Sequence, residues 1–178
     1  MLFRSLAEAK GVLTLLDFAA TGAPGRLHLV GEWESPAFED VVRRRIATEG
    51  LGDRVELHGL LVGDAKWAVF RAAHVLLHPT HWDGQPVTIL EALAFGLPVV
   101  ATQIGAIPDT IRSGVEGYLM ANGSAAELAA GVRMITADAQ TYAGYASRAR
   151  ASFLERFTSE RFAEAMAKLF DEAAGQAP

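Results

Sequence analysis

Short apolar runs alternate with amphipathic segments along most of the chain. The apolar runs are bounded by glycine or polar turns and predict buried strands; they stand at residues 26–31, 54–59, 75–77, 97–102 and 117–120. The other segments carry apolar residues at helical spacing; they stand at residues 11–22, 37–49, 65–72, 88–95, 109–114, 125–137, 139–155 and 159–173. This alternation predicts an α/β fold, a doubly wound, Rossmann-like parallel sheet with helices on both faces.

Capping residues place several helix boundaries. Ser35 suits the N-cap and Pro36 the first helical position of the helix at 37–49, because proline lacks the N–H that would have no partner there. Asp64 and Ser124 are the expected caps of two later helices. We assign residues 1–156 to one Rossmann-like domain whose first strand is truncated, and residues 157–178 to a C-terminal helix and a frayed tail.

Composition narrows the classes of partner. The chain of 178 residues has a net charge of −5, so a nucleic acid is not an expected partner. It has no cysteine, which excludes disulfides and thiolate metal sites. No apolar run reaches the length of a membrane span, and we expect a cytoplasmic protein.

Residues 78–102 hold the strongest local signal for a ligand site. An apolar strand ends at His78, turns through residues 82–86 and enters a helix that Gly96 closes. Such a turn directs free N–H groups of the helix towards whatever lies beyond the strand. Pro86 suits the first helical turn, and Gly84 allows a ligand to approach the backbone. Strand–turn–helix units are common in α/β domains, so an ordinary structural turn is the competing interpretation.

Acidic and basic residues support the ligand interpretation. In a parallel sheet, ligands bind at the carboxyl ends of the strands, where loops from distant segments meet. This edge collects Arg4, Lys10, Asp83 and Glu91 with the turns around residues 31–33, 58–61 and 103–106. Cations and a helix N-terminus suit phosphate oxygens, and a carboxylate suits the hydroxyls of a ribose. The pattern predicts a nucleotide-phosphate site but does not give the reaction.

Several motifs carry a resemblance to a known family. The segments that carry it, in chain order, are AEAKG, LHLVGEWES, RVELHGLL, LLHPTHWDGQPVTILEALAFGLPVVATQIGAIPDTI and GVEGYLM. In the same order, these segments resemble five patterns of that family: a basic residue followed by glycine, L-x-I-V-G-x-G, V-x-F-x-G, P-S-x-x-E-G-x-P-x-x-x-x-E-A-x-A-x-G-x-P-V-V-A-T and G-x-x-G-x-L. Together they resemble the C-terminal, donor-binding half of a GT-B-fold retaining glycosyltransferase, of the large group 1 type that uses sugar nucleotides.

The resemblance implies roles for particular residues. Glu91 matches the acidic residue that binds the nucleotide's ribose, and Asp83 matches the residue that meets the donor sugar or its phosphate. Aspartate at position 83 departs from the family's usual glutamate and shortens the arm by one methylene. The implied phosphate-facing turn consists of Gly84, Gln85 and Pro86. The segment whose backbone is implied to contact the base consists of Leu60 and Leu61. Lys10 and Arg4 match the cations that neutralise the diphosphate, and His78 is a candidate for lining the donor pocket.

The implied reaction needs no cofactor, because the nucleotide-diphosphate sugar is a substrate. We also expect no metal: the chain lacks an Asp-x-Asp pair, and His74, His78 and His81 straddle a strand and a turn. The resemblance further implies that an N-terminal acceptor domain is absent from this chain, or is supplied by a partner chain. Any peripheral membrane association would come through that missing half.

Two other functions compete with transfer. A non-catalytic module could bind a nucleotide-sugar and present it to a partner chain. A GT-B nucleotide-sugar 2-epimerase is less favoured, because the chain lacks the extra acidic and histidine positions of those enzymes. A dinucleotide dehydrogenase is weaker still, since no G-x-G-x-x-G follows the first strand.

Overall fold

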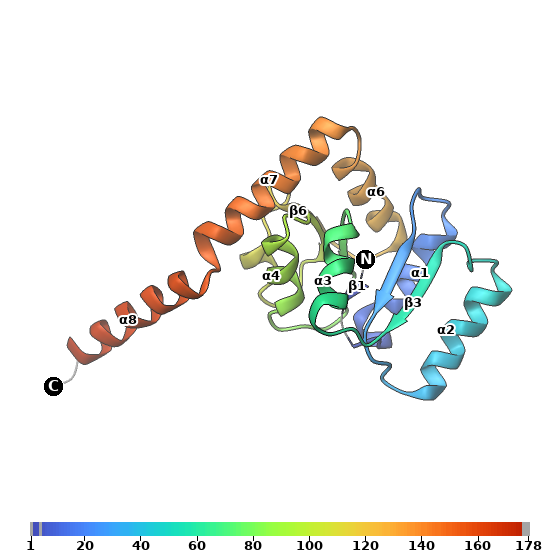
Figure 1. Ribbon diagram of the computed structural model, residues 1–178, viewed down its shortest axis with the longest axis horizontal. Coiled ribbons are helices and arrows are strands. Elements are labelled where there is room, and N and C mark those ends of the chain that lie inside the picture. Colours follow the sequence, from blue (N-terminus) through green and yellow to red (C-terminus); the bar gives the residue numbers. More distant parts are fainter. Residues whose placement is uncertain (1, 4, 176–178) are drawn as a thin grey trace.

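The computed structural model describes residues 2–3 and 5–175. Strands and helices alternate along the chain as far as residue 120, and consecutive helices then follow (Figure 1). The strands are β1 (Leu2–Phe3), β2 (Leu27–Val30), β3 (Val55–Gly59), β4 (Leu76–His78), β5 (Val99–Thr102) and β6 (Gly117–Met120). The helices are the 3₁₀ turn η1 (Glu8–Lys10), α1 (Val12–Ala20), α2 (Pro36–Thr48), α3 (Gly63–Ala72), α4 (Val87–Ala94), α5 (Ile107–Thr110), α6 (Ala125–Ile135), α7 (Ala139–Arg156) and α8 (Ser159–Gly175).

The described strands pair in parallel and in doubly wound order. One three-stranded sheet has the order β1-β2-β3 and the other has β4-β5-β6. Residues of β1 and β4 contact each other, so the spatial order is β3-β2-β1-β4-β5-β6. This is the arrangement of dinucleotide-binding sheets, with its switch point between β1 and β4. The predicted fold class is confirmed.

Two hydrophobic clusters cover the sheet. The first packs α1, α2 and α6 against β2 and β3, and it takes in Val12, Leu15, Leu16 and Ala19, the predicted apolar face of α1. The second packs α3 and α4 against β4 and β5. Alternate residues of a strand face opposite sides, so neighbours such as Leu29 and Val30 enter different clusters.

Some predicted boundaries are confirmed and others are wrong. The Ser35 hydroxyl accepts a hydrogen bond from the Phe38 N–H at 3.1 Å, and Pro36 opens α2 as expected. Ser124 forms a capping box at the start of α6. The prediction for Asp64 is wrong, because α3 begins at Gly63 and Asp64 lies in its first turn.

The short helical segment predicted at 109–114 is also displaced. The helix α5 spans Ile107–Thr110, and the chain then turns around the fully buried carboxylate of Glu116. The backbone N–H of Arg112 donates to Glu116 Oε2 at 2.9 Å, and the Arg112 guanidinium pairs with Oε1. The Arg156 guanidinium lies 3.9 Å from the same oxygen. A buried carboxylate must be paired, and this need outweighs the helical pattern of the local sequence.

The helix α8 stands apart from the sheet. It extends away from the body of the molecule in Figure 1, and the structure describes all of Ser159–Gly175 without a buried residue among them. Phe162, Leu169 and Phe170 are each more than half exposed. The division of the chain at residue 156 stays a prediction, and the tail at 176–178 lies outside the described residues.

Glu116 gives a test of the turn after α5. Burial raises the pKa of Glu116, but hydrogen bonds from Arg112 outweigh that effect and set the pKa below its ordinary value of 4.5. We expect Glu116→Gln to lower the free energy of unfolding at pH 7 by about 2 kcal/mol, because Arg112 and Arg156 lose their partner. A lowered folded-state pKa stabilises the fold above the unfolded-state pKa, and this stabilisation is lost as the pH falls through the folded-state value.

Urea unfolding of both proteins between pH 7 and pH 3 measures this contribution. The difference between wild type and Glu116→Gln should shrink as the pH falls below about 4.5. Glu172→Gln, on the exposed helix α8, is the control and should change the unfolding free energy by less than about 1 kcal/mol. A pH-independent difference would contradict the assigned role of the carboxylate.

Candidate functional site

A cleft opens at the carboxyl edge of the sheet. It has a volume of about 470 Å³ and lies between the turns after β2 and β3 and the start of α4. The lining residues are Ser5, Gly31, Glu32, Trp33, Leu60, Lys66, Val87, Thr88 and Glu91. This is the edge where the loops of a doubly wound sheet bind their ligands.

Turns after β2 and β3 form one wall of the cleft. The Gly31 N–H donates to the Gly59 carbonyl oxygen at 2.9 Å, which ties the two turns together. Gly59 has φ +68°, a left-handed conformation that suits glycine. Leu60 follows it and projects into the cleft with 64% of its surface exposed. Leu61, the next residue, instead packs against the hydrophobic cluster around α3 and α4.

Glu91 lies in the cleft and is paired with Lys66. The Lys66 Nζ is 2.7 Å from Glu91 Oε1, and the two side chains come from α3 and α4. The same ammonium group lies 4.7 Å from the centre of the Trp67 ring. Sequence reasoning missed Lys66, because nothing in the spacing of α3 marks one of its polar positions as facing α4. The pair holds the Glu91 carboxylate in place while leaving both side chains at the cleft.

A second, buried cluster joins Lys10, His78 and Asp83. The Asp83 Oδ2 lies 3.1 Å from His78 Nε2 and 3.6 Å from Lys10 Nζ. Lys10 also donates to the Trp82 carbonyl oxygen at 2.8 Å, and its ammonium lies 5.4 Å from the Trp82 ring centre. Asp83 does not cap α4, because the N-cap of that helix is Pro86 and the Asp83 carboxylate faces His78 and Lys10.

Close backbone contacts bring the turns of this cluster together. A Cβ at Gly11 would lie 2.0 Å from the Pro79 carbonyl oxygen, and one at Gly105 would lie 2.3 Å from that of Asp83. Both glycines have positive φ, +76° and +56°. The Ala106 N–H donates to the Gly84 carbonyl oxygen at 2.9 Å. The turns that hold Lys10 and Asp83 are thereby fixed relative to each other by contacts that only glycine allows.

The turn at 84–86 connects the cluster to the cleft. Gly84 and Gln85 are exposed, and Pro86 is buried at the N-cap of α4 with φ −73° and ψ 114°. Pro86 therefore precedes the first helical position, which corrects the sequence prediction. Val87 and Thr88, which follow it, line the cleft. The first N–H groups of α4 lack helical partners, and they directly follow the turn that begins at Asp83.

The predicted site residues thus fall into two adjoining groups. Leu60 and Glu91 line the cleft, while Lys10, His78 and Asp83 form the buried cluster. Arg4 lies outside the described residues. The expected absence of a metal or cofactor at this site stays a prediction, as do the roles assigned to its residues.

The comparisons with known proteins agree with this architecture. The family model of glycosyl transferases group 1 matches residues 2–138, and the chain belongs to this family. The lipopolysaccharide core biosynthesis mannosyltransferase LpsB of Rhizobium meliloti (strain 1021) is 30% identical over 137 residues, which cover 76% of this chain and 38% of LpsB. This chain spans less than half of the length of that relative.

Solved structures give the same result. Anabaena Alr3699/HepE in complex with UDP superposes with a TM-score of 0.86 at 26% identity, over 96% of this chain and 48% of that one. The C-terminal domain of LpcC, a glycosyl transferase group 1 family protein from Francisella tularensis, shares the fold, with a TM-score of 0.79 at 20% identity over 89% of this chain and 85% of that domain. The expected half of a GT-B fold is confirmed. Among the helices of the described ranges, none has the length and apolar character to cross a lipid bilayer.

Gly11 gives a test of the packing beneath the site. Gly11→Ala forces a Cβ against the Pro79 carbonyl oxygen, and we expect it to cost about 3–5 kcal/mol of unfolding free energy, the sum of left-handed strain and overpacking. Gly22→Ala is a matched control, since Gly22 also has φ +76° but has nothing within 4 Å of the added carbon. It should cost only about 1–2 kcal/mol.

Denaturant unfolding of the two variants measures the difference directly. Equal costs at Gly11 and Gly22 would show that the turn of Lys10 does not pack on the 79–84 turn as described. A similar slope of free energy against denaturant in both variants is needed for the comparison.

Proposed function

We propose that this chain is the donor-binding half of a glycosyltransferase. It binds a nucleotide-diphosphate sugar, and the sugar passes with retention of configuration to an acceptor held by another half, in the synthesis of a polysaccharide, lipopolysaccharide or glycolipid. The observation that carries the proposal is the cleft with its Lys66–Glu91 pair beside the Lys10–Asp83 cluster. The likeness to HepE, solved with UDP and with UDP-glucose, supports it. A cytoplasmic location is part of the same proposal.

The nucleoside occupies the cleft in this proposal. The Glu91 carboxylate accepts hydrogen bonds from the ribose hydroxyls, as carboxylates do in related nucleotide-binding sheets. Leu60 presents an apolar surface for the base at the opposite wall, and the backbone of Leu60 and Leu61 offers polar groups to its edge. Lys66 holds Glu91 in place at 2.7 Å, so the carboxylate is oriented before the nucleotide arrives.

The diphosphate lies at the start of α4. Gly84 and Gln85 are exposed there, and the free N–H groups of a helix N-terminus favour phosphate oxygens. Lys10 approaches from the neighbouring turn, with its ammonium already directed at the Trp82 carbonyl oxygen beside Asp83. Arg4 supplies a second cation in this proposal.

Bond cleavage then moves charge in the direction that these groups favour. As the bond between the sugar and the diphosphate breaks, the sugar becomes oxocarbenium-like and the diphosphate gains negative charge. Lys10 and the N–H groups of α4 interact more strongly with that charge in the transition state than in the ground state, which accelerates the reaction. Asp83 faces the donor sugar or its phosphate, and His78 fixes its carboxylate at 3.1 Å.

The acceptor half is expected to lie next to α8. The chain spans 38% of LpsB and 48% of HepE, so the relatives contain further sequence that this chain does not match. The exposed residues Phe162, Leu169 and Phe170 recur at helical spacing along one side of α8. A stripe of this kind on a projecting helix indicates a surface that another part of the protein covers.

Calorimetric titration with UDP, GDP, ADP and their sugars tests the proposal. We expect one nucleotide diphosphate to bind preferentially, and Glu91→Ala to weaken it by about 10–100-fold, because hydrogen bonds to a charged group are lost. Lys66→Met should weaken binding less, by about 3–10-fold, since the Glu91 carboxylate remains but is no longer held. Lys66→Arg should restore most of the loss.

The control is Glu155→Ala, an exposed residue of α7, which should leave the affinity unchanged. If Glu91→Ala binds every nucleotide as wild type does, the ribose assignment is wrong. If NMR of the sugar protons shows that the chain alone changes the sugar of the nucleotide-sugar, without an acceptor, the epimerase is favoured instead.

A further inference from the structure

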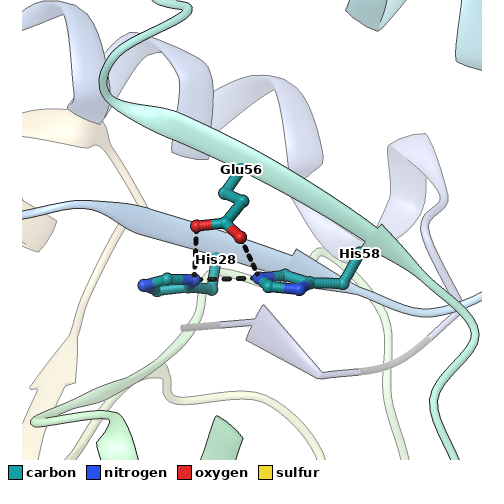
Figure 2. A group of neighbouring side chains, drawn as sticks. All are labelled: His28, Glu56 and His58. Carbon is teal, nitrogen blue, oxygen red and sulfur yellow. Dashed lines mark hydrogen bonds and ion pairs between the residues drawn. The ribbon is translucent and has the colours of Figure 1, made fainter.

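Three potential metal ligands converge on the face of the sheet near its β3 edge. They are His28 on β2 and Glu56 and His58 on β3 (Figure 2). His28 and Glu56 are direct neighbours in the parallel register, and His58 lies two residues beyond Glu56, so all three side chains project from the same face. None of these three residues is among the described residues that line the donor cleft.

The donor atoms form a small triangle. His28 Nδ1 and His58 Nε2 are 2.9 Å apart, and their rings stack with centres 5.2 Å apart. One oxygen of Glu56 lies 3.5 Å from His28 Nδ1, and the other lies 3.6 Å from His58 Nε2. Figure 2 shows the carboxylate facing both nitrogens at once. The two ring nitrogens are within hydrogen-bond distance of each other, whereas the Glu56 oxygens lie beyond good hydrogen-bond distance from either ring.

These separations match those of ligands around a zinc ion. With bonds of about 2.0–2.1 Å and tetrahedral angles, neighbouring ligand atoms lie about 3.3 Å apart. The two nitrogens are 2.9 Å apart, and each lies 3.5 or 3.6 Å from a different oxygen of the Glu56 carboxylate, so the three distances fall on both sides of that value. One ligand atom from each of the three side chains lies within 4.8 Å of the other two, so small side-chain rotations would bring the three around one ion.

The cluster is also accessible. The side chains of His28, His58 and Glu56 are 32%, 19% and 48% exposed. An ion can therefore reach them from solvent, and a fourth ligand can complete the coordination. Two imidazoles and one carboxylate form a ligand set that binds zinc with an open position.

We propose that His28, Glu56 and His58 bind one divalent transition-metal ion of the zinc type, with water as the fourth ligand. The ion would join β3, at the edge of the sheet, to β2 next to the register shift between Leu29 and Val30. His58 also immediately precedes Gly59 and Leu60, the turn that forms one wall of the cleft. This site is separate from donor binding and does not depend on it.

Titration of the untagged, metal-free 178-residue chain with Zn²⁺ tests the proposal. We expect one ion per chain by calorimetry, with an affinity that falls at least about tenfold in His28→Gln and in His58→Gln. His81→Gln is the matched control, because it removes an exposed histidine away from the triangle, and it should bind as wild type does. Substitution with Co²⁺ should give the intense visible absorption of a four-coordinate ion.

Folding of each variant is checked by circular dichroism, and Glu56→Gln provides a third variant with the same side-chain shape. It should fold as wild type does and lose at least about tenfold in Zn²⁺ affinity. Zn²⁺ should raise the melting temperature of wild type and of His81→Gln, and raise it less in the three ligand variants. Absence of stoichiometric binding by wild type, or binding that the three ligand variants leave unchanged, would overturn the proposal.

Discussion

The site depends first on backbone packing between turns that are distant in sequence. Gly11 lies against Pro79, and Gly105 lies against Asp83 and Gly84, at distances that leave no space for a side chain. Because these contacts join rigid peptide groups, they fix the turns more closely than flexible side chains could. The positions of the Lys10 ammonium and the Asp83 carboxylate are restrained as a result, because each side chain projects from one of the packed turns. Preorganisation of this kind is what stabilisation of a developing charge requires.

The strands and longer helices follow from the periodicity of apolar residues, so most of the fold could be predicted from sequence. The segment after α5 could not, because the burial of Glu116 between Arg112 and Arg156 is a tertiary effect. In the site, the motif around residues 78–91 marks Asp83 and Glu91, but the Lys66–Glu91 contact joins two helices without any fixed spacing. The three potential metal ligands require the strand register. One sequence signal could have predicted that register: when the final glycines of RLHLVG and RVELHG are aligned, His28 falls opposite Glu56, as in the structure.

The turn after β3 links two regions with different chemistry. Gly59 adopts φ +68° and redirects the chain, so that His58 stays on the sheet face while Leu60 enters the cleft. Among the described strands β3 has one neighbour in the sheet, and a strand at the edge of a sheet leaves one row of backbone N–H and C=O groups unpaired. A group that stiffens β3 near His58 would also stiffen the cleft wall formed by Leu60, because only Gly59 separates the two residues. The hydrogen bond from Gly31 to Gly59 already contributes such a restraint from β2.

The charges around the predicted donor site suit an anionic ligand, although the net charge of the chain is −5. Each carboxylate of the predicted donor site is accompanied by a lysine, Lys10 beside Asp83 and Lys66 beside Glu91. The pairs offset the repulsion that unaccompanied carboxylates would exert on a diphosphate, while they leave the carboxylate oxygens able to accept hydrogen bonds from hydroxyl groups. The two pairs are not equivalent. Lys10 and Asp83 are buried, where water screens charge weakly, whereas Lys66 and Glu91 are partly exposed. In the proposed function, charge stabilisation therefore falls to the buried pair, and recognition of hydroxyl groups falls to the pair in the cleft.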